Sequence, residues 1–281
     1  DWFGSHEYIF RLYLNRSNSC TFTGMVFLKA GLYFLPYAAG VGYFFMWRKS
    51  REGENAPPVE LRTSKNDKEL LYQDLAGKYD ASISADERLM LLGLMRYWLV
   101  SKAEGRVLEV AGGTGRNFKY YKPDCEVTFT DSSVAMVQTA QEKANKLRPK
   151  EKAEIFNFDV QDAENLNYPD NSFDTVVGTF GLCSVDHPER QLREMQRVCK
   201  DDGTILLMEH GASSYEILRN LQAAYAQKHY DKWGCIYNRD IDKLVEESGS
   251  RVKDKRTFHL GTTHLIIAEP NKEKPSQQQP G

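Results

Sequence analysis

The chain lacks the cysteine patterns that build zinc sites or disulfide frameworks. Its five cysteines are widely spaced and form no C-x-x-C pair, which argues against both kinds of site. Cys183 and Cys199 lie in apolar stretches and are predicted to be core residues. His259 and His264 flank a Gly-Thr-Thr turn between two predicted strands, and no metal site is expected there.

The sequence also lacks an excess of positive charge. It has 37 Lys and Arg residues against 39 Asp and Glu residues, which gives a formal net charge of −2. No basic stripe with interleaved aromatic residues runs along it. Nucleic acid is therefore not expected as a partner or substrate.

Complete phosphate-binding glycine motifs are missing as well. Gly113-x-Gly115 is followed three residues later by Phe118, where a dinucleotide fingerprint needs Gly or Ala. No Lys-Ser or Lys-Thr pair follows the loop, which excludes a P-loop. An ordinary strand-to-helix turn also favours glycine, so the loop alone leaves a purely structural role open.

What the sequence does contain is a pair of strand ends that carry carboxylates. The buried-strand pattern Val107–Val110 includes Glu109 and leads through the glycine-rich loop to a polar helix start at 116–117. A second apolar run, Glu126–Thr130, ends at Asp131. Two adjacent parallel strands with these carboxylates suit a ligand that has a ribose and an amino-acid head, because a carboxylate accepts hydrogen bonds from both ribose hydroxyls.

The downstream pattern alternates strands and helices. A strand is predicted over Phe173–Phe180 and a helix over Pro188–Cys199, followed by a turn at Lys200–Gly203. A further strand over Thr204–Met208 leads to Glu209-His210-Gly211. This alternation predicts a parallel sheet wrapped by helices, with the ligand across the carboxyl ends of the strands.

The stretch from Glu109 to Gly115 resembles motif I of the class I S-adenosylmethionine-dependent methyltransferases. The phrases Asp162–Leu166 and Pro169–Asp174 are similar to those of the ubiquinone and menaquinone biosynthesis C-methyltransferases. The resemblance covers roughly 70–268. It implies an α/β, Rossmann-like fold with a mostly parallel seven-stranded sheet, helices on both faces, and S-adenosyl-L-methionine as cofactor.

Two narrower resemblances concern membrane enzymes. Leu182–Val185 and Met208–His210 also occur in membrane-bound thiol methyltransferases of animals. Gly234-Cys235 and Asn238–Ile241, together with an apolar N-terminal run, resemble fungal mitochondrial inner-membrane methyltransferase-like proteins.

The resemblance also implies which residues hold the cofactor. Asp162 would accept a hydrogen bond from the adenine amine and the Ala163 amide would donate to a ring nitrogen. The alternative for Asp162 is a solvated loop charge. Thr179 and Gly181 would line the methyl-transfer pocket. The full set of expected cofactor-binding residues is Glu109, Ala111, Gly113, Gly115, Asp131, Ser132, Asp162, Ala163 and Thr179.

Ala111 departs from the family pattern, which has glycine at this position. A methyl group is tolerable there if the backbone φ is negative, although it would narrow the space beside the methionine moiety. Some mitochondrial relatives resemble this chain in having alanine there, so we interpret Ala111 as a variant rather than a disabling change.

Methyl transfer mainly requires that nucleophile and methyl group be aligned, and a base is needed only if the nucleophile arrives protonated. His210, after a strand end, is the first candidate base and His187 the second, because histidine titrates near neutrality. A hydrogen-bonded structural histidine is the alternative for each. The helical pattern Ser213–Lys228 lies where this fold inserts a substrate lid.

The N-terminal quarter has a different character. Met25–Trp47 contains one charge, Lys29, and a helix of this length covers roughly 34 Å, enough to cross a bilayer core of about 30 Å. A buried hairpin is the alternative. We expect an N-terminal flank over 1–23, a transmembrane helix over 24–47, a linker over 48–68, a methyltransferase domain over 69–269 and a disordered tail over 270–281.

The sequence thus predicts a methyltransferase anchored by one span in the mitochondrial inner membrane, with its domain on the matrix side, because positive charge follows the span. The start at Asp1 fits either a cleaved mitochondrial presequence or a truncated sequence. The expected substrate is small and hydrophobic, a quinone precursor or a lipophilic thiol. The alternatives are a non-catalytic subunit of a membrane protein complex, and a protein methyltransferase.

Overall fold

The computed structural model describes residues 65–147 and 151–272. Its helices are α3 (Lys65–Leu75), α4 (Tyr79–Leu89), α5 (Leu92–Val100), η1 (Phe118–Tyr120), α6 (Val134–Ala144), α7 (Glu151–Glu154), α8 (Pro188–Val198), α9 (Glu216–Trp233), α10 (Ile241–Glu247) and η2 (His259–Gly261). Its strands are β1 (Arg106–Val110), β2 (Glu126–Asp131), β3 (Phe156–Val160), β4 (Phe173–Thr179), β5 (Cys199–His210), β6 (Arg251–Phe258) and β7 (Thr263–Glu269).

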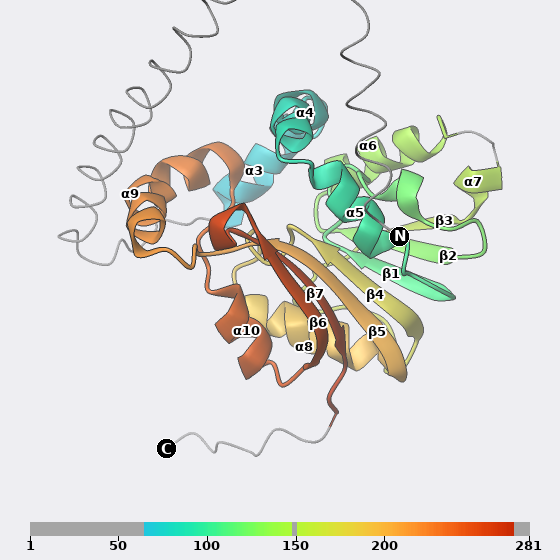
Figure 1. Cartoon of the computed structure of the whole chain (residues 1–281). Helices are drawn as coiled ribbons and strands as arrows, with labels where there is room; N and C mark the ends of the chain where they lie inside the picture. Colours follow the sequence, from blue (N-terminus) through green and yellow to red (C-terminus); the bar gives the residue numbers. More distant parts are fainter. Residues whose placement is uncertain (1–64, 148–150, 273–281) are drawn as a thin grey trace, which may run out of the picture. The chain divides into compact units, whose positions relative to one another are not determined.

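The seven strands form one sheet in the order β3-β2-β1-β4-β5-β7-β6 (Figure 1). The first five strands are parallel, and β7 runs antiparallel to both β5 and β6. The predicted mostly parallel seven-stranded sheet is confirmed. The strand order reverses between β1 and β4, and an open α/β sheet binds its ligand at the carboxyl ends of the strands beside such a reversal.

One face of the sheet packs against α5, α6 and η1. Val107 of β1 and Phe129 of β2 point to this face, because side chains alternate between the two faces along a strand. Leu99 of α5 and Ala140 of α6 cover them, and all four side chains are fully buried. Glu109 lies two residues after Val107 and therefore points to the same face.

The opposite face packs against α8 and α10. Leu108 and Val110 of β1 point to this face and meet Leu192 of α8 in one buried cluster, to which Ile241 of α10 also belongs. Helices thus cover both faces of the sheet, as predicted. Because strands buried on both faces are apolar at nearly every position, β1 reads in the sequence as a continuous apolar run interrupted only by Glu109.

All described elements belong to one compact unit, residues 52–281. Its three hydrophobic clusters are built only from side chains between positions 71 and 268. The unit therefore has its own cores and can fold by itself.

The predicted transmembrane helix over 24–47, the flank over 1–23, the linker up to residue 64 and the tail from residue 273 lie outside the described residues. Within the described ranges, no helix has both the length and the apolar character needed to cross a bilayer.

Two local expectations were wrong. The polar helix start at 116–117 leads only to the single 3-10 turn η1, because Phe118 and Tyr121 turn inward and are buried instead of continuing a solvent-facing helix. The turn expected at 200–203 is part of β5, which begins directly after α8 at Cys199. The extra residues there appear as an irregularity in the pairing of β4 with β5.

Candidate cofactor-binding site

The glycine loop after β1 lies at the point where the strand order reverses. A Cβ on Gly112 would lie 2.1 Å from the ring of Phe129, and one on Gly115 would lie 2.3 Å from the ring of Phe118. No atom lies within 4 Å of the corresponding position at Gly113. Gly112 and Gly115 are therefore required for packing, whereas Gly113 presents bare backbone to open space where a ligand can approach closely.

Ala111 has a φ of +51°, so the condition of a negative φ, under which a methyl group is easily tolerated, is not met. The chain must turn sharply between β1 and the loop, and this turn uses the left-handed region that a side chain disfavours. Phe180, directly after the neighbouring strand β4, is also left-handed, with a φ of +58°. Strained non-glycine residues of this kind cluster at functional sites. The Ala111 methyl packs beside Gly181, where an added Cβ would come within 3.1 Å of it.

Asp131, at the end of β2, lies beside the loop. One carboxylate oxygen accepts a hydrogen bond from the amide of Gly113 at 2.9 Å and the other from the amide of Ser133 at 2.9 Å. Burial raises the pKa of Asp131 and the two amides oppose that rise. Ser132 is exposed next to it, and Ser133 caps α6. The carboxylate is therefore held rigidly at the strand end and keeps unused acceptor positions for ligand hydroxyls.

Glu109 is fully buried in a polar network on the same face. Its carboxylate accepts hydrogen bonds from the side-chain amide of Asn117 at 2.9 Å and from the hydroxyl of Tyr121 at 2.8 Å. Burial raises the pKa of Glu109 to about 7, although both hydrogen bonds favour the ionised form. The network extends to Thr179, whose hydroxyl accepts from Asn117 at 2.9 Å. The structure thus brings two expected residues, Glu109 and Thr179, into one network.

Arg96 of α5 completes this network and was not among the predicted residues. Its guanidinium donates to Asn117 Oδ1 at 2.9 Å, Thr179 Oγ1 at 2.9 Å and Glu87 at 3.1 Å. It also lies 5.0 Å from the ring centroid of Phe180. Arg96 is buried, and its Nε has no hydrogen-bond partner within the described structure. One signal was available in the sequence, because Arg96 is the only charge in an otherwise apolar helix.

Helix α4 closes over the glycine loop through ion pairs that the sequence did not reveal. Asp80 accepts from the Thr114 hydroxyl at 2.6 Å and from Arg116 at 2.9 Å, and it also pairs with Lys143 of α6. Glu87, two turns further along α4, pairs with Arg116 as well. These cations lower the pKa of Asp80 and of Glu87 against the opposing effect of burial. The spacing of seven residues that puts Asp80 and Glu87 on one side of a helix was the available signal.

Asp162 and Ala163 follow β3, on the far side of Asp131 from the loop. Asp162 is exposed and accepts a hydrogen bond from the amide of Glu164 at 2.9 Å, while Ala163 is buried. The Asp162 side chain thus closes its own turn, which agrees with either reading made from the sequence: an adenine contact or a solvated loop charge.

The two candidate bases have different surroundings. The ring of His210 is stacked on that of Phe180 with centroids 4.2 Å apart, and burial lowers its pKa to about 3. A neutral imidazole with this pKa is a weak base near pH 7. His187 is exposed at the start of α8, 3.5 Å from Glu189. His210 therefore lies at the site as a neutral, stacked ring, and His187 lies on the surface.

The loop after β4 contacts the region after α9. Cys183 and Cys235 are buried core residues, and the Cys183 thiol donates to the Phe180 carbonyl at 3.3 Å. The Ile236 amide donates to the Cys183 carbonyl at 2.8 Å. Cys199 is buried as predicted. Helix α9 begins at Glu216, three residues later than the expected start at Ser213, and continues beyond Lys228 to Trp233. Within the described residues, no group of three metal-ligating side chains occurs.

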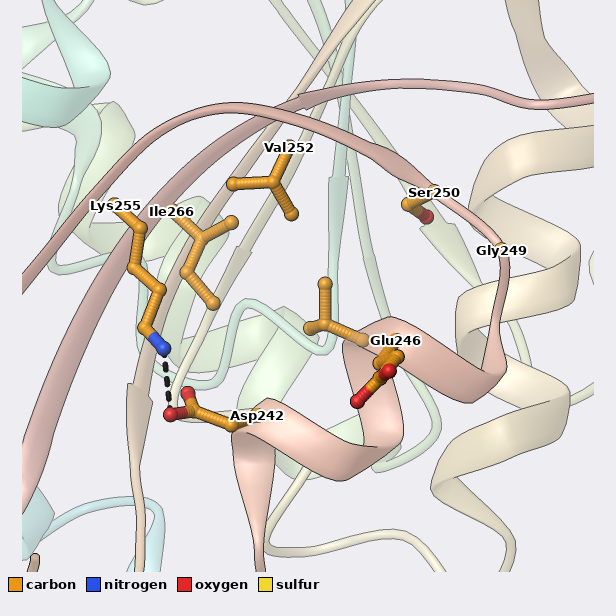
Figure 2. Close-up of a pocket in the computed structure, with 8 residues that line it drawn as sticks. Asp242, Glu246, Gly249, Ser250, Val252, Lys255 and Ile266 are labelled. Carbon is orange, nitrogen blue, oxygen red and sulfur yellow. Dashed lines mark ion pairs between the residues drawn. The ribbon is translucent and has the colours of Figure 1, made fainter.

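A cavity of about 420 Å³ lies elsewhere, between α10 and β6. Figure 2 shows the Lys255 side chain pointing toward Asp242 at one side of this cavity. The two residues form an ion pair with their charged atoms 2.5 Å apart. The lining of the cavity comes only from α10, β6, β7 and the connection between α10 and β6, so it is separate from the strand ends that carry Gly113 and Asp131.

The residues at the strand-order reversal fit a nucleoside with an amino-acid head. Gly113 offers open backbone, Asp131 offers a rigid carboxylate for hydroxyl groups, and the unpartnered Nε of buried Arg96 offers a donor for an anionic group. Together with the sheet order, this defines a class I S-adenosylmethionine-dependent methyltransferase. The chain belongs to this family: the model described as "Methyltransferase domain" matches residues 83–254.

The most similar relatives include the protein named "Methyltransferase OMS1, mitochondrial" of Saccharomyces cerevisiae. It is 36% identical over 214 residues, which cover 70% of this chain and 45% of the yeast protein. The chain thus spans less than half of that relative. The ubiquinone/menaquinone biosynthesis C-methyltransferase UbiE of Shewanella frigidimarina is 31% identical over 201 residues, 67% of this chain and 77% of that enzyme.

Solved structures share the fold. The YcgJ protein of Bacillus subtilis aligns with a TM-score of 0.52 at 18% identity, over 65% of this chain and 98% of that one. The [4+2]-cyclase SpnF aligns with a TM-score of 0.50 at 18% identity, over 66% of this chain and 82% of that one. Because a cyclase shares the fold, the reaction must be argued from the site.

Proposed function

We propose that this S-adenosylmethionine-dependent methyltransferase is anchored in a mitochondrial membrane and methylates a small hydrophobic acceptor, a quinone precursor or a lipophilic thiol. The observation that supports this acceptor class is the aromatic surroundings at the end of β4, where the methyl group would face its acceptor: Phe180 follows the strand, and its ring stacks on that of His210. The names of the two relatives, one a mitochondrial methyltransferase and one a quinone methyltransferase, support this proposal.

When bound, S-adenosylmethionine supplies an electrophilic methyl group on a sulfonium. We assign Asp131, with Ser132, to the ribose and the Gly113 backbone to the methionine portion. Asp162 and the Ala163 amide would hold the adenine. Glu109 and Thr179 act through Asn117, which they hold in place beside the loop.

The acceptor proton, where there is one, needs a group with suitable basicity. Burial lowers the pKa of His210 to about 3, so this ring would orient the acceptor by stacking and by accepting a hydrogen bond rather than by removing a proton near pH 7. An acceptor that is already ionised, such as a thiolate or a phenolate, needs no such base. Alignment of nucleophile and methyl group then supplies most of the rate enhancement.

The first test is calorimetric titration of residues 52–281 with S-adenosylmethionine and S-adenosylhomocysteine. Asp131→Ala should weaken binding at least tenfold, and the exposed Asp124→Ala should leave it unchanged, with folding of each variant checked by thermal unfolding. Binding would then justify a screen of quinols and lipophilic thiols as acceptors. If the folded wild-type domain binds neither compound, the left-handed Ala111 closes the site and the proposal fails.

A further inference from the structure

Helix α5 is apolar on both of its sides. Its only charge, Arg96, is buried in the site, and Leu92, Leu99 and Val100 are buried in the core. A surface helix normally carries polar residues on the side that faces solvent. Helix α5 does not, which indicates that its outer side is covered by something apolar.

The apolar residues on the outer side of α5 continue into the corner between α4 and α5. We call these exposed residues the α5 surface; they are Leu89, Met90, Leu91, Leu94 and Tyr97, with exposed fractions of 81%, 37%, 59%, 65% and 59%. Leu91, Leu94 and Tyr97 follow one another at intervals of three residues and so share one side of the helix. Single exposed leucines are ordinary, but a contiguous group of this kind marks an interaction surface.

Cations border the α5 surface. Lys102 and Arg256 lie 4.6 Å and 4.3 Å from the ring of Trp98, the residue that follows Tyr97. On the adjoining side, Lys119 lies 4.9 Å from the ring of Tyr120, which itself contacts Tyr97 at 6.3 Å. Exposed aliphatic side chains flanked by aromatic rings and Lys or Arg are the pattern of a surface that lies in a membrane interface.

Acidic residues near the α5 surface are few. Glu87 turns inward and pairs with Arg96 and Arg116. Asp86, one turn before Met90 on α4, is exposed at the margin. Asp254 of β6 pairs with Arg256 at 3.3 Å, so Lys102 and Lys119 are the cations that matter most here. The charge that borders the apolar side chains is therefore mainly positive, which complements anionic lipid headgroups.

We propose that the α5 surface rests on a bilayer that contains anionic lipid and orients the carboxyl edge of the sheet toward it. This inference rests on the proposed function, in which Met25–Trp47 anchors the chain. The 17 residues from 48 to 64 can span up to about 60 Å when extended, and α3 to α5 are the first elements after them. Because the α5 surface follows the anchor so closely in the sequence, it can reach the same membrane.

The inner side of α5 links this docking to the substrate. Arg96 donates to Thr179 and Asn117 in the site, so one helix separates the candidate bilayer face from the methyl-transfer pocket. A hydrophobic acceptor would pass from the lipid past α5 without crossing water.

The test is co-sedimentation of residues 52–281 with two kinds of vesicle: phosphatidylcholine that contains about 30% phosphatidylglycerol, and pure phosphatidylcholine. Replacing Leu89, Leu91 and Leu94 together by Gln should lower the partition coefficient at least tenfold. Val252→Gln, an exposed apolar residue on β6, is the matched control and should not change it. Lys102→Gln with Lys119→Gln should lower binding several-fold only for the anionic vesicles.

Equal binding by the triple variant, or no binding by the folded wild-type domain, would overturn the proposal. It would also be overturned if ultracentrifugation showed a wild-type dimer that the triple variant loses, since a second copy would then cover the surface. Cofactor titration of the wild-type domain separates the two proposals: a wild-type domain that binds the cofactor but not the vesicles refutes only the docking, and one that binds the vesicles but not the cofactor refutes only the enzyme assignment.

A second measurement uses the full chain. Hydrogen exchange of the segment 88–98 should slow at least threefold in anionic nanodiscs relative to detergent, and the triple variant should remove the difference. Equal exchange in both would contradict the docking.

Discussion

At the residue scale, adjacent glycines in the loop after β1 face different surroundings. Gly112 lies against the buried ring of Phe129, where an added Cβ would come within 2.1 Å. Gly113 faces open space but has a φ of +61°. The first position is therefore constrained by packing and the second by backbone conformation and by access for the ligand.

Gly112→Ala should destabilise the domain by about 2–3 kcal/mol, because Phe129 must move within a filled core. Gly113→Ala should cost about 1 kcal/mol, the penalty of a left-handed alanine, yet weaken cofactor binding more strongly. Urea denaturation and calorimetric titration of both variants measure the two effects. Equal losses of stability would show that the loop and Phe129 are not packed as described.

The raised pKa of Glu109 predicts how the stability of the domain depends on pH. This pKa is raised by burial from 4.5 to about 7, so the contribution of Glu109 to stability is fully present below pH 4.5 and is lost as the pH rises through 7. The stability of wild type relative to Glu109→Gln should therefore fall between about pH 5 and pH 7.5, by an amount on the order of 3 kcal/mol.

Denaturation curves of both proteins at several pH values provide the measurement. Glu142→Gln, which removes an exposed carboxylate of α6, controls for the change in net charge. A difference between wild type and Glu109→Gln that stays constant across this range would contradict a buried carboxyl that titrates near neutrality.

At the scale of elements, α4 and α5 close the site from outside the sheet. Their contacts with the loop are charged: Glu87 pairs with Arg96 and Arg116, and Asp80 with Arg116 and Lys143. Such pairs add little when exposed, but Arg96 and Glu87 are largely buried, and removal of one partner leaves the other without compensation.

Arg96→Met should lower the free energy of unfolding by about 2–4 kcal/mol and weaken cofactor binding, because Asn117 and Thr179 lose a donor. Arg88→Met, at an exposed position of α4, is the matched control and should change stability by less than about 0.5 kcal/mol. Unfolding in urea tests both. If Arg96→Met matched the control, the network would not stabilise the fold.

The elements themselves were accessible to sequence reasoning in different degrees. The apolar runs of β1, β2 and β4 and the helices α8 and α9 were predicted because each has a clear period or a continuous apolar pattern. The absence of a helix after the glycine loop was not predicted. The choice between a helix and η1 depends on whether Phe118 and Tyr121 find space in a core formed by β2, β3 and α6.

At the scale of the whole molecule, the sheet has one charged edge. β6 carries Arg251, Lys253, Lys255 and Arg256, which pair with acidic residues and leave the strand exposed along its length. Charged edge strands oppose pairing with other chains, so this edge favours a domain that does not extend its sheet to a second copy. The apolar α5 surface lies at the corner between α4 and α5, and Arg256 of β6 borders it through the ring of Trp98.

The sequence by itself determined the fold family, the alternation of strands and helices along the chain and the identity of the residues that follow the strands, because these depend on local periods and on glycine and carboxylate positions that few folds combine. Only the tertiary structure decided the conformation of Ala111, the network of Arg96 with Glu109, and the neutral, stacked state of His210. Those properties arise where segments far apart in the chain meet, and burial and pairing at such meetings set both backbone strain and pKa.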